Sequence, residues 1–110
     1  LSLHDALPIS LMARWRELQE LGHLPDSPVA QEHAVTHLDW FADIPGTPTH
    51  SGDAENSTAM ILGVADLYES NPDFHRTFGT KAAAKFAADS LRIHIAHLPQ
   101  PGRSSKVREA

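Results

Sequence analysis

Residues 71–97 read NPDFHRTFGTKAAAKFAADSLRIHIAH, and this stretch decides the fold class because it encodes two consecutive helices. Asn71 is a favourable N-cap, and Pro72 fits the first helical position, where its missing N–H costs nothing. Gly79 is placed to end the helix. We therefore predict a short helix over 72–78. Its apolar side chains, one turn apart, are Phe74 and Phe78.

A longer helix is predicted from Thr80 to His97. Alanine dominates it, and small side chains permit the close approach of a neighbouring helix. The residues expected on its apolar face are Ala83, Phe86, Ala87, Leu91, His94 and Ile95. Pro99 follows the helix and cannot continue it, and we expect a disordered tail over 98–110.

Three further amphipathic helices are predicted upstream, over 11–21, 28–42 and 57–69. Ser10 is the expected N-cap of the first, and Gly22 is placed to end it. The apolar residues at helical spacing are Leu11, Trp15, Leu18 and Leu21 in the first, Ala30, Ala34, Leu38 and Phe41 in the second, and Met60, Val64, Leu67 and Tyr68 in the third. No alternating strand pattern occurs in the sequence, so the predicted fold class is all-α, a bundle of about five helices.

A polar segment follows the predicted helix over 28–42. Ser27 and Pro28 mark the start of that helix as N-cap and first residue, and Pro45 cannot continue it. The segment 42–56 is rich in Pro, Gly, Thr, Ser and Asp, which predicts a long loop. Long loops in small domains are often functional, so we expect a mobile lid here.

The chain has 110 residues, a formal net charge of −5 and no cysteine. This length suits one domain with a modest core. No stripe of Lys and Arg offers an electrostatic footprint, so we expect no nucleic-acid binding by this part of the protein. The longest apolar run, 59–65, is too short to span a membrane. The lack of cysteine excludes thiolate chemistry and fits the cytoplasm, where we expect the protein.

The first ten residues, LSLHDALPIS, resemble the conceptual translation of a sequencing adapter, because Asp5 to Ile9 read Asp-Ala-Leu-Pro-Ile. Every predicted apolar stripe begins at or after Leu11. We therefore expect residues 1–10 to be an artefact outside the core, the native domain to span 11–97, and the upstream part of the gene to be missing.

Two pairs of histidines each share a helix face, His33 with His37 at i, i+4 and His94 with His97 at i, i+3. Both spacings suit a metal site. No carboxylate completes a zinc-protease motif, so the simpler interpretation is histidines of amphipathic helices. A His-based metal site, catalytic or structural, is the alternative.

Candidate acids and bases for catalysis are scattered. Asp39, Asp66 and Asp89 stand singly on separate predicted helices, and no trio of Ser, His and Asp is identifiable. We therefore predict that the protein is not an enzyme, with no catalytic residue and no cofactor.

The aromatic residues favour a cleft for an apolar ligand. They lie on separate helices that must meet in a small bundle, and an ordinary core is the alternative. Because Trp40 and Phe41 lead directly into the polar segment, we expect ligand contacts from these two and from Tyr68, with His37 and Asp39 at the rim. This interpretation makes the protein a small-molecule receptor, and a purely helical interaction module is a further alternative.

Three blocks of sequence resemble one known family: PDSPVAQEHAVTHLDWF at 25–41, LGVADLYESNPDFHRTFG at 62–79 and AAKFAADSLRIH at 83–94. They resemble the TipAS antibiotic-recognition domain, the C-terminal effector-binding half of a class of MerR-family transcription regulators. The resemblance spans Leu11 to His94. It implies a globin-like fold and a cleft that sequesters bulky, largely apolar antibiotics such as thiopeptides.

The resemblance also implies partners beyond this fragment. A full-length regulator of this class carries a DNA-binding winged helix-turn-helix and a dimerising coiled coil ahead of the domain. Stand-alone relatives act instead as drug-sequestering resistance proteins, and that alternative stays open. In both cases the implied ligand is a small molecule, and no membrane partner is expected.

Two departures from the family pattern affect the expected selectivity. Some relatives carry a cysteine just after the aromatic pair that captures a reactive antibiotic covalently. This chain reads ADIPGTPTHSGDAENS at 42–57, which is longer and lacks Cys, so covalent capture is excluded. Asp73 stands where many relatives have Arg, and Asn71 where many have Asp; the helix cap survives this exchange and an Arg salt bridge does not.

Overall fold

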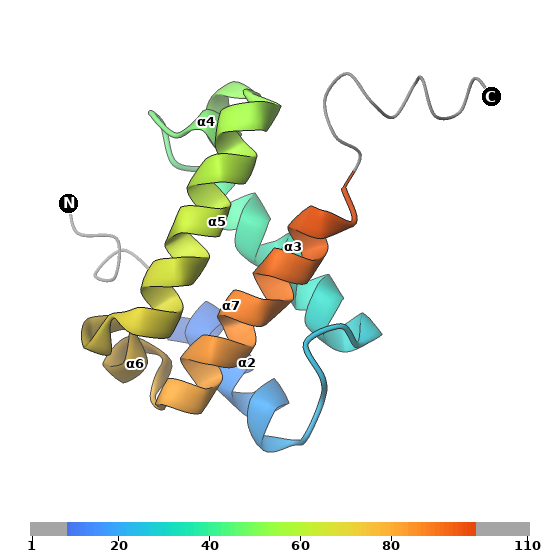
Figure 1. The fold of residues 1–110 in the computed structure, drawn as a ribbon, viewed down its shortest axis with the longest axis vertical. Coiled ribbons are helices and arrows are strands. Elements are labelled where there is room, and N and C mark those ends of the chain that lie inside the picture. The colour runs from blue at the N-terminus through green and yellow to red at the C-terminus, as the bar shows by residue number, and fades with distance from the viewer. Residues whose placement is uncertain (1–8, 99–110) are drawn as a thin grey trace.

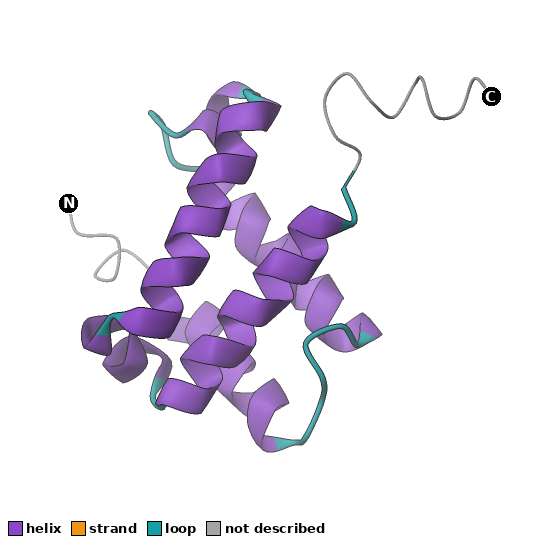
Figure 2. Cartoon of the chain, in the orientation of Figure 1, coloured by secondary structure: helices purple, strands orange, loops and turns teal. Residues whose placement is uncertain are grey.

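A computed structural model describes residues 9–98. The predicted adapter residues 1–8 and the predicted tail from residue 99 onward lie outside the described residues. Within 9–98 the chain forms helices and no strand (Figures 1 and 2). The helices are α2 (Ile9–Glu20), α3 (Pro28–Ala42), α4 (Pro48–Ser51), α5 (Ala54–Ser70), α6 (Pro72–Phe78) and α7 (Lys81–Ala96). The all-α prediction is therefore confirmed.

Helix limits follow the predicted capping residues at two places. The Ser27 side chain accepts a hydrogen bond from the Ala30 N–H, so α3 has the limits predicted for it, Pro28–Ala42. Asn71 caps α6 in the same way. Thr80, predicted as the first residue of the last helix, instead caps α7. These side-chain acceptors satisfy N–H groups that have no partner within the helix.

The start of α2 differs from the prediction, whereas its end agrees with it. Ser10 lies inside the helix and does not cap it. Gly22 has φ +86° and its N–H donates to the Gln19 carbonyl, while the His23 N–H donates to the Leu18 carbonyl. This double closure is a Schellman motif, for which the left-handed conformation favours glycine. Ile9 and Ser10 are exposed, so Leu11 is the first buried residue of the described chain.

The predicted long loop over 42–56 is wrong, because this segment contains α4 and the first turn of α5. Thr47 caps α4: its hydroxyl accepts from the His50 N–H at 3.1 Å. Asp53 caps α5, which therefore begins at Ala54, three residues before the predicted start. The composition of the segment suggested a loop, but its Thr-Pro and Asp residues act as helix starts.

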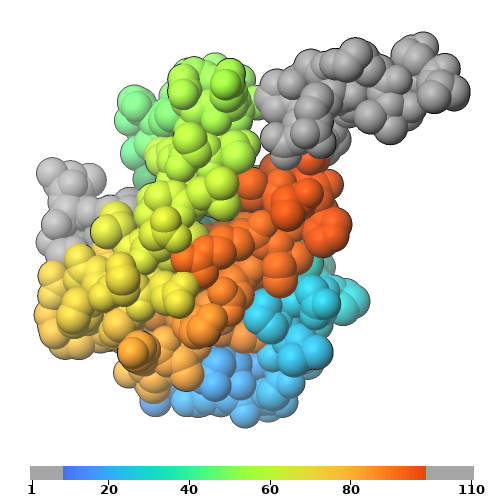
Figure 3. All heavy atoms as spheres, in the orientation of Figure 1, coloured from blue at the N-terminus to red at the C-terminus, as the bar shows by residue number. Residues whose placement is uncertain are grey.

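Helix α7 lies at the centre of the bundle and contacts α2, α3, α5 and α6. In Figure 1, α5, α6 and α7 form a front layer, and α2 and α3 lie behind it. Figure 3 shows the side chains of α5 and α7 closing over this face. The close approach depends on alanines of α7 that are 0 % exposed: Ala83, Ala84, Ala87 and Ala88. The alanine-rich helix is thus the packing centre of the fold.

Two of the predicted apolar faces are right in part: Ala30, Ala34 and Phe41 of α3 and Val64 and Tyr68 of α5 are buried as predicted, and the other members are not. In α5 the buried residues are Ile61, Val64, Ala65 and Tyr68, and the predicted Leu67 is 45 % exposed. In α3 the predicted Leu38 is only partly buried, and His37 is buried instead. Adjacent helical residues point about 100° apart, so only one of each pair faces the core. In both helices the residue of the pair that faces the core carries a large polar ring, Tyr68 in α5 and His37 in α3.

No helix within residues 9–98 is long and apolar enough to cross a bilayer.

Candidate functional site

Five aromatic side chains meet in the interior, and we call them the aromatic centre: Trp15, His37, Trp40, Phe41 and Tyr68. Three of them come from α3, and α2 and α5 supply one each. His37 is the hub. The centroid of its ring lies 5.3 Å from that of Phe41, 5.6 Å from that of Tyr68, 6.0 Å from that of Trp15 and 6.1 Å from that of Trp40. These separations are typical of interacting rings.

A chain of hydrogen bonds runs through the aromatic centre. The Trp15 indole Nε1–H donates to His37 Nδ1 at 2.9 Å. On the other side of the ring, His37 Nε2 lies 3.0 Å from the Tyr68 hydroxyl oxygen. Because an indole nitrogen can only donate, His37 Nδ1 must be unprotonated, and a neutral ring then carries its hydrogen on Nε2. His37 therefore donates to Tyr68.

Burial keeps both titratable members of the chain neutral. His37 and Tyr68 are each 0 % exposed. Burial, together with a smaller contribution from charge repulsion by the nearby His33, lowers the pKa of His37 to about 3. Burial raises the pKa of Tyr68. An imidazolium or a phenolate would lack solvation here, so the centre is polar but uncharged.

The outer edge of the aromatic centre is formed by Trp40. Its ring stands edge-on to His37 at 85° and lies 5.0 Å from the ring of Phe41. Trp40 is only partly buried, whereas Phe41 is 1 % exposed. A series of contacting rings therefore runs from the partly exposed Trp40 to the buried His37–Tyr68 pair.

Four of the five predicted ligand-binding residues meet here, namely His37, Trp40, Phe41 and Tyr68. Asp39 does not join them, because it is exposed. His37 lies in the interior and not at a rim. Ligand binding by these residues stays a prediction. Trp15 was predicted only as a core residue; the signal that could have added it is that a buried indole N–H needs an acceptor, which a histidine supplies.

The predicted histidine pairs form other contacts. His33 Nε2 lies 2.9 Å from the Leu11 carbonyl oxygen, and His97 Nδ1 lies 2.8 Å from the Ile93 carbonyl oxygen. Both ring nitrogens of His37 are engaged as described above. Within the described residues no group of three or more His, Cys, Asp or Glu side chains is placed to hold a metal ion.

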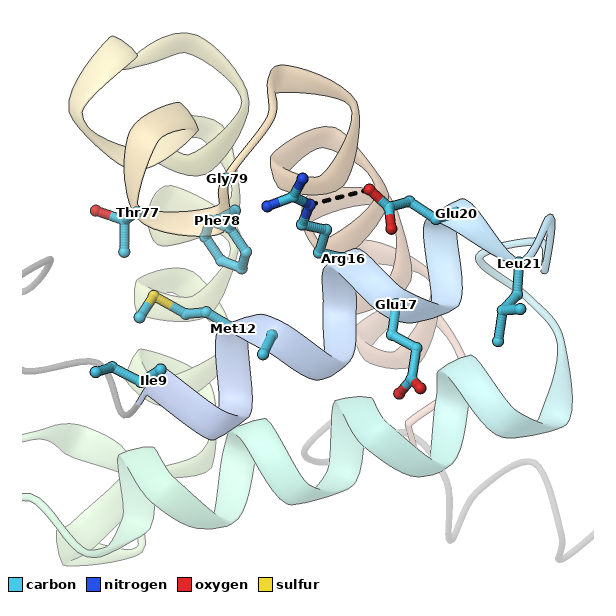
Figure 4. Close-up of a pocket in the computed structure, with 10 residues that line it drawn as sticks. Ile9, Met12, Arg16, Glu17, Glu20, Leu21, Thr77, Phe78 and Gly79 are labelled. Atoms are coloured by element: carbon cyan, nitrogen blue, oxygen red, sulfur yellow. Dashed lines mark hydrogen bonds and ion pairs between the residues drawn. The ribbon is translucent and has the colours of Figure 1, made fainter.

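Two hollows lie on the surface away from the aromatic centre. One, of about 410 Å³, lies between α2 and α6, with Met12 and Phe78 at its base (Figure 4). The Arg16 guanidinium there is paired with Glu20 at 2.9 Å. The other hollow, of about 600 Å³, lies between α5 and α7 and is lined mainly by charged side chains.

Arg92 at the second hollow holds two helices together. Its guanidinium lies 2.7 Å from an Asp66 carboxylate oxygen and 2.6 Å from one of Glu69, both on α5. A third partner, Asp89, lies on α7 itself at 3.1 Å. Two of the three carboxylates considered for catalysis, Asp66 and Asp89, are thus occupied in this ion-pair cluster.

Comparison with known proteins identifies one family. The model of the TipAS antibiotic-recognition domain matches residues 5–94, which includes every residue of the aromatic centre and extends into the segment expected to be an adapter artefact. Comparisons with curated proteins and with solved structures returned no significant match. The chain therefore belongs to the TipAS antibiotic-recognition domain family.

Proposed function

We propose that this domain binds a bulky, largely apolar small molecule at the aromatic centre and does so without catalysing a reaction. The observation that carries the proposal is the assembly of five rings from three helices, among them a neutral His37–Tyr68 pair, in a member of an antibiotic-recognition family. Apolar walls with a few fixed polar groups are the usual composition of a small-molecule site.

Access to the site runs past Trp40, the partly exposed ring of the centre. In this proposal, movement of the Trp40 side chain exposes the two rings that it contacts, His37 and Phe41. Each apolar Å² removed from water contributes about 25 cal/mol, so a ligand that covers these rings gains several kcal/mol. Reordering of the Trp40 side chain offsets part of this gain.

The domain serves, in this proposal, as the sensing part of a MerR-type transcription regulator in the cytoplasm. This part of the proposal rests on the family alone. The net charge of −5 opposes direct contact with nucleic acid, so DNA binding and dimerisation would belong to other parts of such a regulator. A stand-alone drug-sequestering protein would use the same site, and sequence upstream of this chain distinguishes the two cases.

The test is the free energy of unfolding with and without a thiopeptide antibiotic. A ligand that binds only the folded state raises this free energy, by about 2.7 kcal/mol at 100 times its dissociation constant. We expect micromolar affinity or better, together with a change in tryptophan fluorescence. The same measurement is made with a panel of other large apolar antibiotics, each at its solubility limit. If none of these compounds shifts the unfolding curve, the proposal is contradicted.

A further inference from the structure

The hydrogen-bond chain of the aromatic centre contains one more hydrogen than it can use. Trp15 Nε1, the neutral ring of His37 and the Tyr68 hydroxyl each carry one polar hydrogen. The chain has only two junctions, Trp15 to His37 at 2.9 Å and His37 to Tyr68 at 3.0 Å. Three hydrogens shared between two junctions leave one without an acceptor.

The surplus hydrogen belongs to Tyr68. If Tyr68 donated to His37 Nε2, the neutral imidazole would carry its hydrogen on Nδ1, where it would face the Trp15 N–H. A doubly protonated His37 would create the same clash and would also bury a charge. The only consistent arrangement runs from Trp15 to His37 to Tyr68 and leaves the Tyr68 O–H free to donate.

The described part of the chain offers this hydrogen no acceptor. The Tyr68 hydroxyl forms no hydrogen bond other than that with His37 within residues 9–98, and the rings of Phe74 and Phe78 lie beside its ring, each with its centroid 4.9 Å from that of Tyr68. Tyr68 is 0 % exposed, so bulk water does not reach its side chain. A buried donor without an acceptor loses the hydrogen bonds that it makes to water in the unfolded chain.

We propose that the ligand of the aromatic centre carries a neutral hydrogen-bond acceptor, a carbonyl oxygen, that accepts the Tyr68 O–H. The inference rests on the proposed function and adds the chemical class of the ligand: an apolar body with a carbonyl at the end that reaches Tyr68. The acceptor is neutral because no cationic side chain contacts His37 or Tyr68 within the described residues, and a carboxylate would be buried without a counter-charge.

The test compares two probes of nearly equal shape, the ketone fluorenone and the hydrocarbon fluorene. Binding of each is followed by tryptophan fluorescence in the wild-type protein and in Tyr68→Phe. We expect the wild-type protein to prefer the ketone by threefold to tenfold, the worth of about one hydrogen bond. In Tyr68→Phe the preference should disappear while fluorene still binds.

Ser90→Ala is the matched control. Ser90 is also 0 % exposed and also carries a hydroxyl, which donates to the Phe86 carbonyl at 2.8 Å and lies outside the aromatic centre. This variant loses a buried hydroxyl and should keep the preference for the ketone. If Ser90→Ala keeps the preference, the loss of preference in Tyr68→Phe cannot be explained by the loss of stability that follows removal of a buried hydroxyl.

Infrared spectroscopy of fluorenone bound to the wild-type protein provides a measurement that does not depend on a variant folding. A hydrogen-bonded carbonyl absorbs at lower wavenumber than the same carbonyl in cyclohexane, and we expect that lower value. A carbonyl band at the cyclohexane position, equal affinities for the two probes, a preference that persists in Tyr68→Phe, or binding of neither probe overturns the inference. The proposed function is decided separately by the thiopeptide experiment.

Discussion

At the scale of single residues, His37 shows how a polar side chain can replace an aliphatic one in a helical core. Its two ring nitrogens meet Trp15 and Tyr68, so no polar atom of the ring is left without a partner. A buried polar group is tolerated when every hydrogen-bonding position is used. Because the folded state buries a neutral His37, protonation of this side chain favours the unfolded state.

Stability should fall as the pH is lowered from about 6.5, where the unfolded His37 titrates, to about 3, where the folded one does. The folded pKa lies below the unfolded value, so the unfolded state binds the proton first, and the free energy of unfolding drops by about 1.4 kcal/mol per pH unit. His33 and His94 add to the trend in the same direction, because burial also lowers their pKa values.

His37→Gln isolates the contribution of this residue. The amide can accept from Trp15 and donate to Tyr68, but it does not titrate. Urea unfolding at several pH values between about 7 and 4 should give a shallower pH dependence for the variant. Equal slopes in the variant and the wild type would show that His37 is protonated equally easily in both states.

Two glycines differ in what surrounds them. Gly22 and Gly79 both have positive φ, at +86° and +98°. A Cβ on Gly22 would meet nothing within 4 Å, whereas one on Gly79 would lie 2.8 Å from Nη1 and 2.9 Å from Cδ of Arg16. In Figure 4 the Arg16 side chain extends toward the α6–α7 turn that contains Gly79.

Gly22→Ala should therefore cost about 1 kcal/mol through backbone strain, and Gly79→Ala should cost more, about 2 kcal/mol, because it also displaces Arg16. Urea unfolding measures both values. In an Arg16→Ala background the cost of Gly79→Ala should decrease, because the clash with Arg16 is removed. An unchanged cost in that background would show that Arg16 does not contribute to it.

At the scale of elements, three helices begin with the same local device, a capping side chain followed by proline. Ser27-Pro28 starts α3, Thr47-Pro48 starts α4 and Asn71-Pro72 starts α6. The first and third were predicted from the sequence. The second was missed because it lies in a segment whose composition favours a loop, and four residues give no apolar periodicity to detect.

Thr47→Ala should destabilise α4 and cost about 1 kcal/mol of global stability. Thr47 accepts from the His50 N–H and also lies within hydrogen-bond distance of the carbonyls of Phe41 and Ile44, so it links α4 to the end of α3. Hydrogen exchange should accelerate in 48–53. Thr36→Ala, on the exposed face of α3, is the control and should leave exchange there unchanged; equal effects would contradict the capping role.

At the scale of the whole molecule, α5 and α7 are held together by apolar packing and by the Arg92 cluster. The Arg92 side chain is 30 % exposed and reaches two carboxylates on the neighbouring helix. Lys85 also forms an ion pair, but with Asp89 on its own helix. Only the first arrangement connects elements that are distant in the sequence.

Arg92→Met should lower the free energy of unfolding by about 1 kcal/mol at low salt, since partly exposed pairs are weak and screened. The loss should shrink at high salt. Lys85→Met removes an exposed pair within one helix and should have a smaller effect. Equal effects of the two variants, measured by urea unfolding at two ionic strengths, would contradict a role for Arg92 in joining α5 to α7.

The sequence predicted the helices well where a cap and a periodic apolar face coincide, as in α3 and α6. It failed on orientation where two large residues are adjacent. Leu67 and Tyr68 both fit an apolar stripe, and which of them faces the core depends on whether a partner such as His37 lies opposite. That pairing joins α3 to α5 and is visible only in three dimensions.

Prediction of the site is limited in the same way, because some of its contacts join helices that are distant in the sequence. His37, Trp40 and Phe41 lie close together in the sequence and were grouped from it, and Tyr68 was added through the aromatic pattern. Trp15 is 22 residues from His37, and no local pattern reports their hydrogen bond. The burial of His37 also depends on α2 and α5, which supply the Trp15 and Tyr68 side chains that contact its ring, and this is a property of the assembled bundle.

The measurement that tests the account most directly is the affinity of Trp40→Leu for the thiopeptide that binds the wild-type protein. Trp40 is partly exposed, so we expect affinity to fall tenfold or more while the free energy of unfolding falls by at most about 2 kcal/mol. Val35→Ala, on the exposed face of the same helix, is the control and should bind like the wild type. Unchanged affinity per folded molecule of Trp40→Leu would contradict the aromatic centre as the binding site.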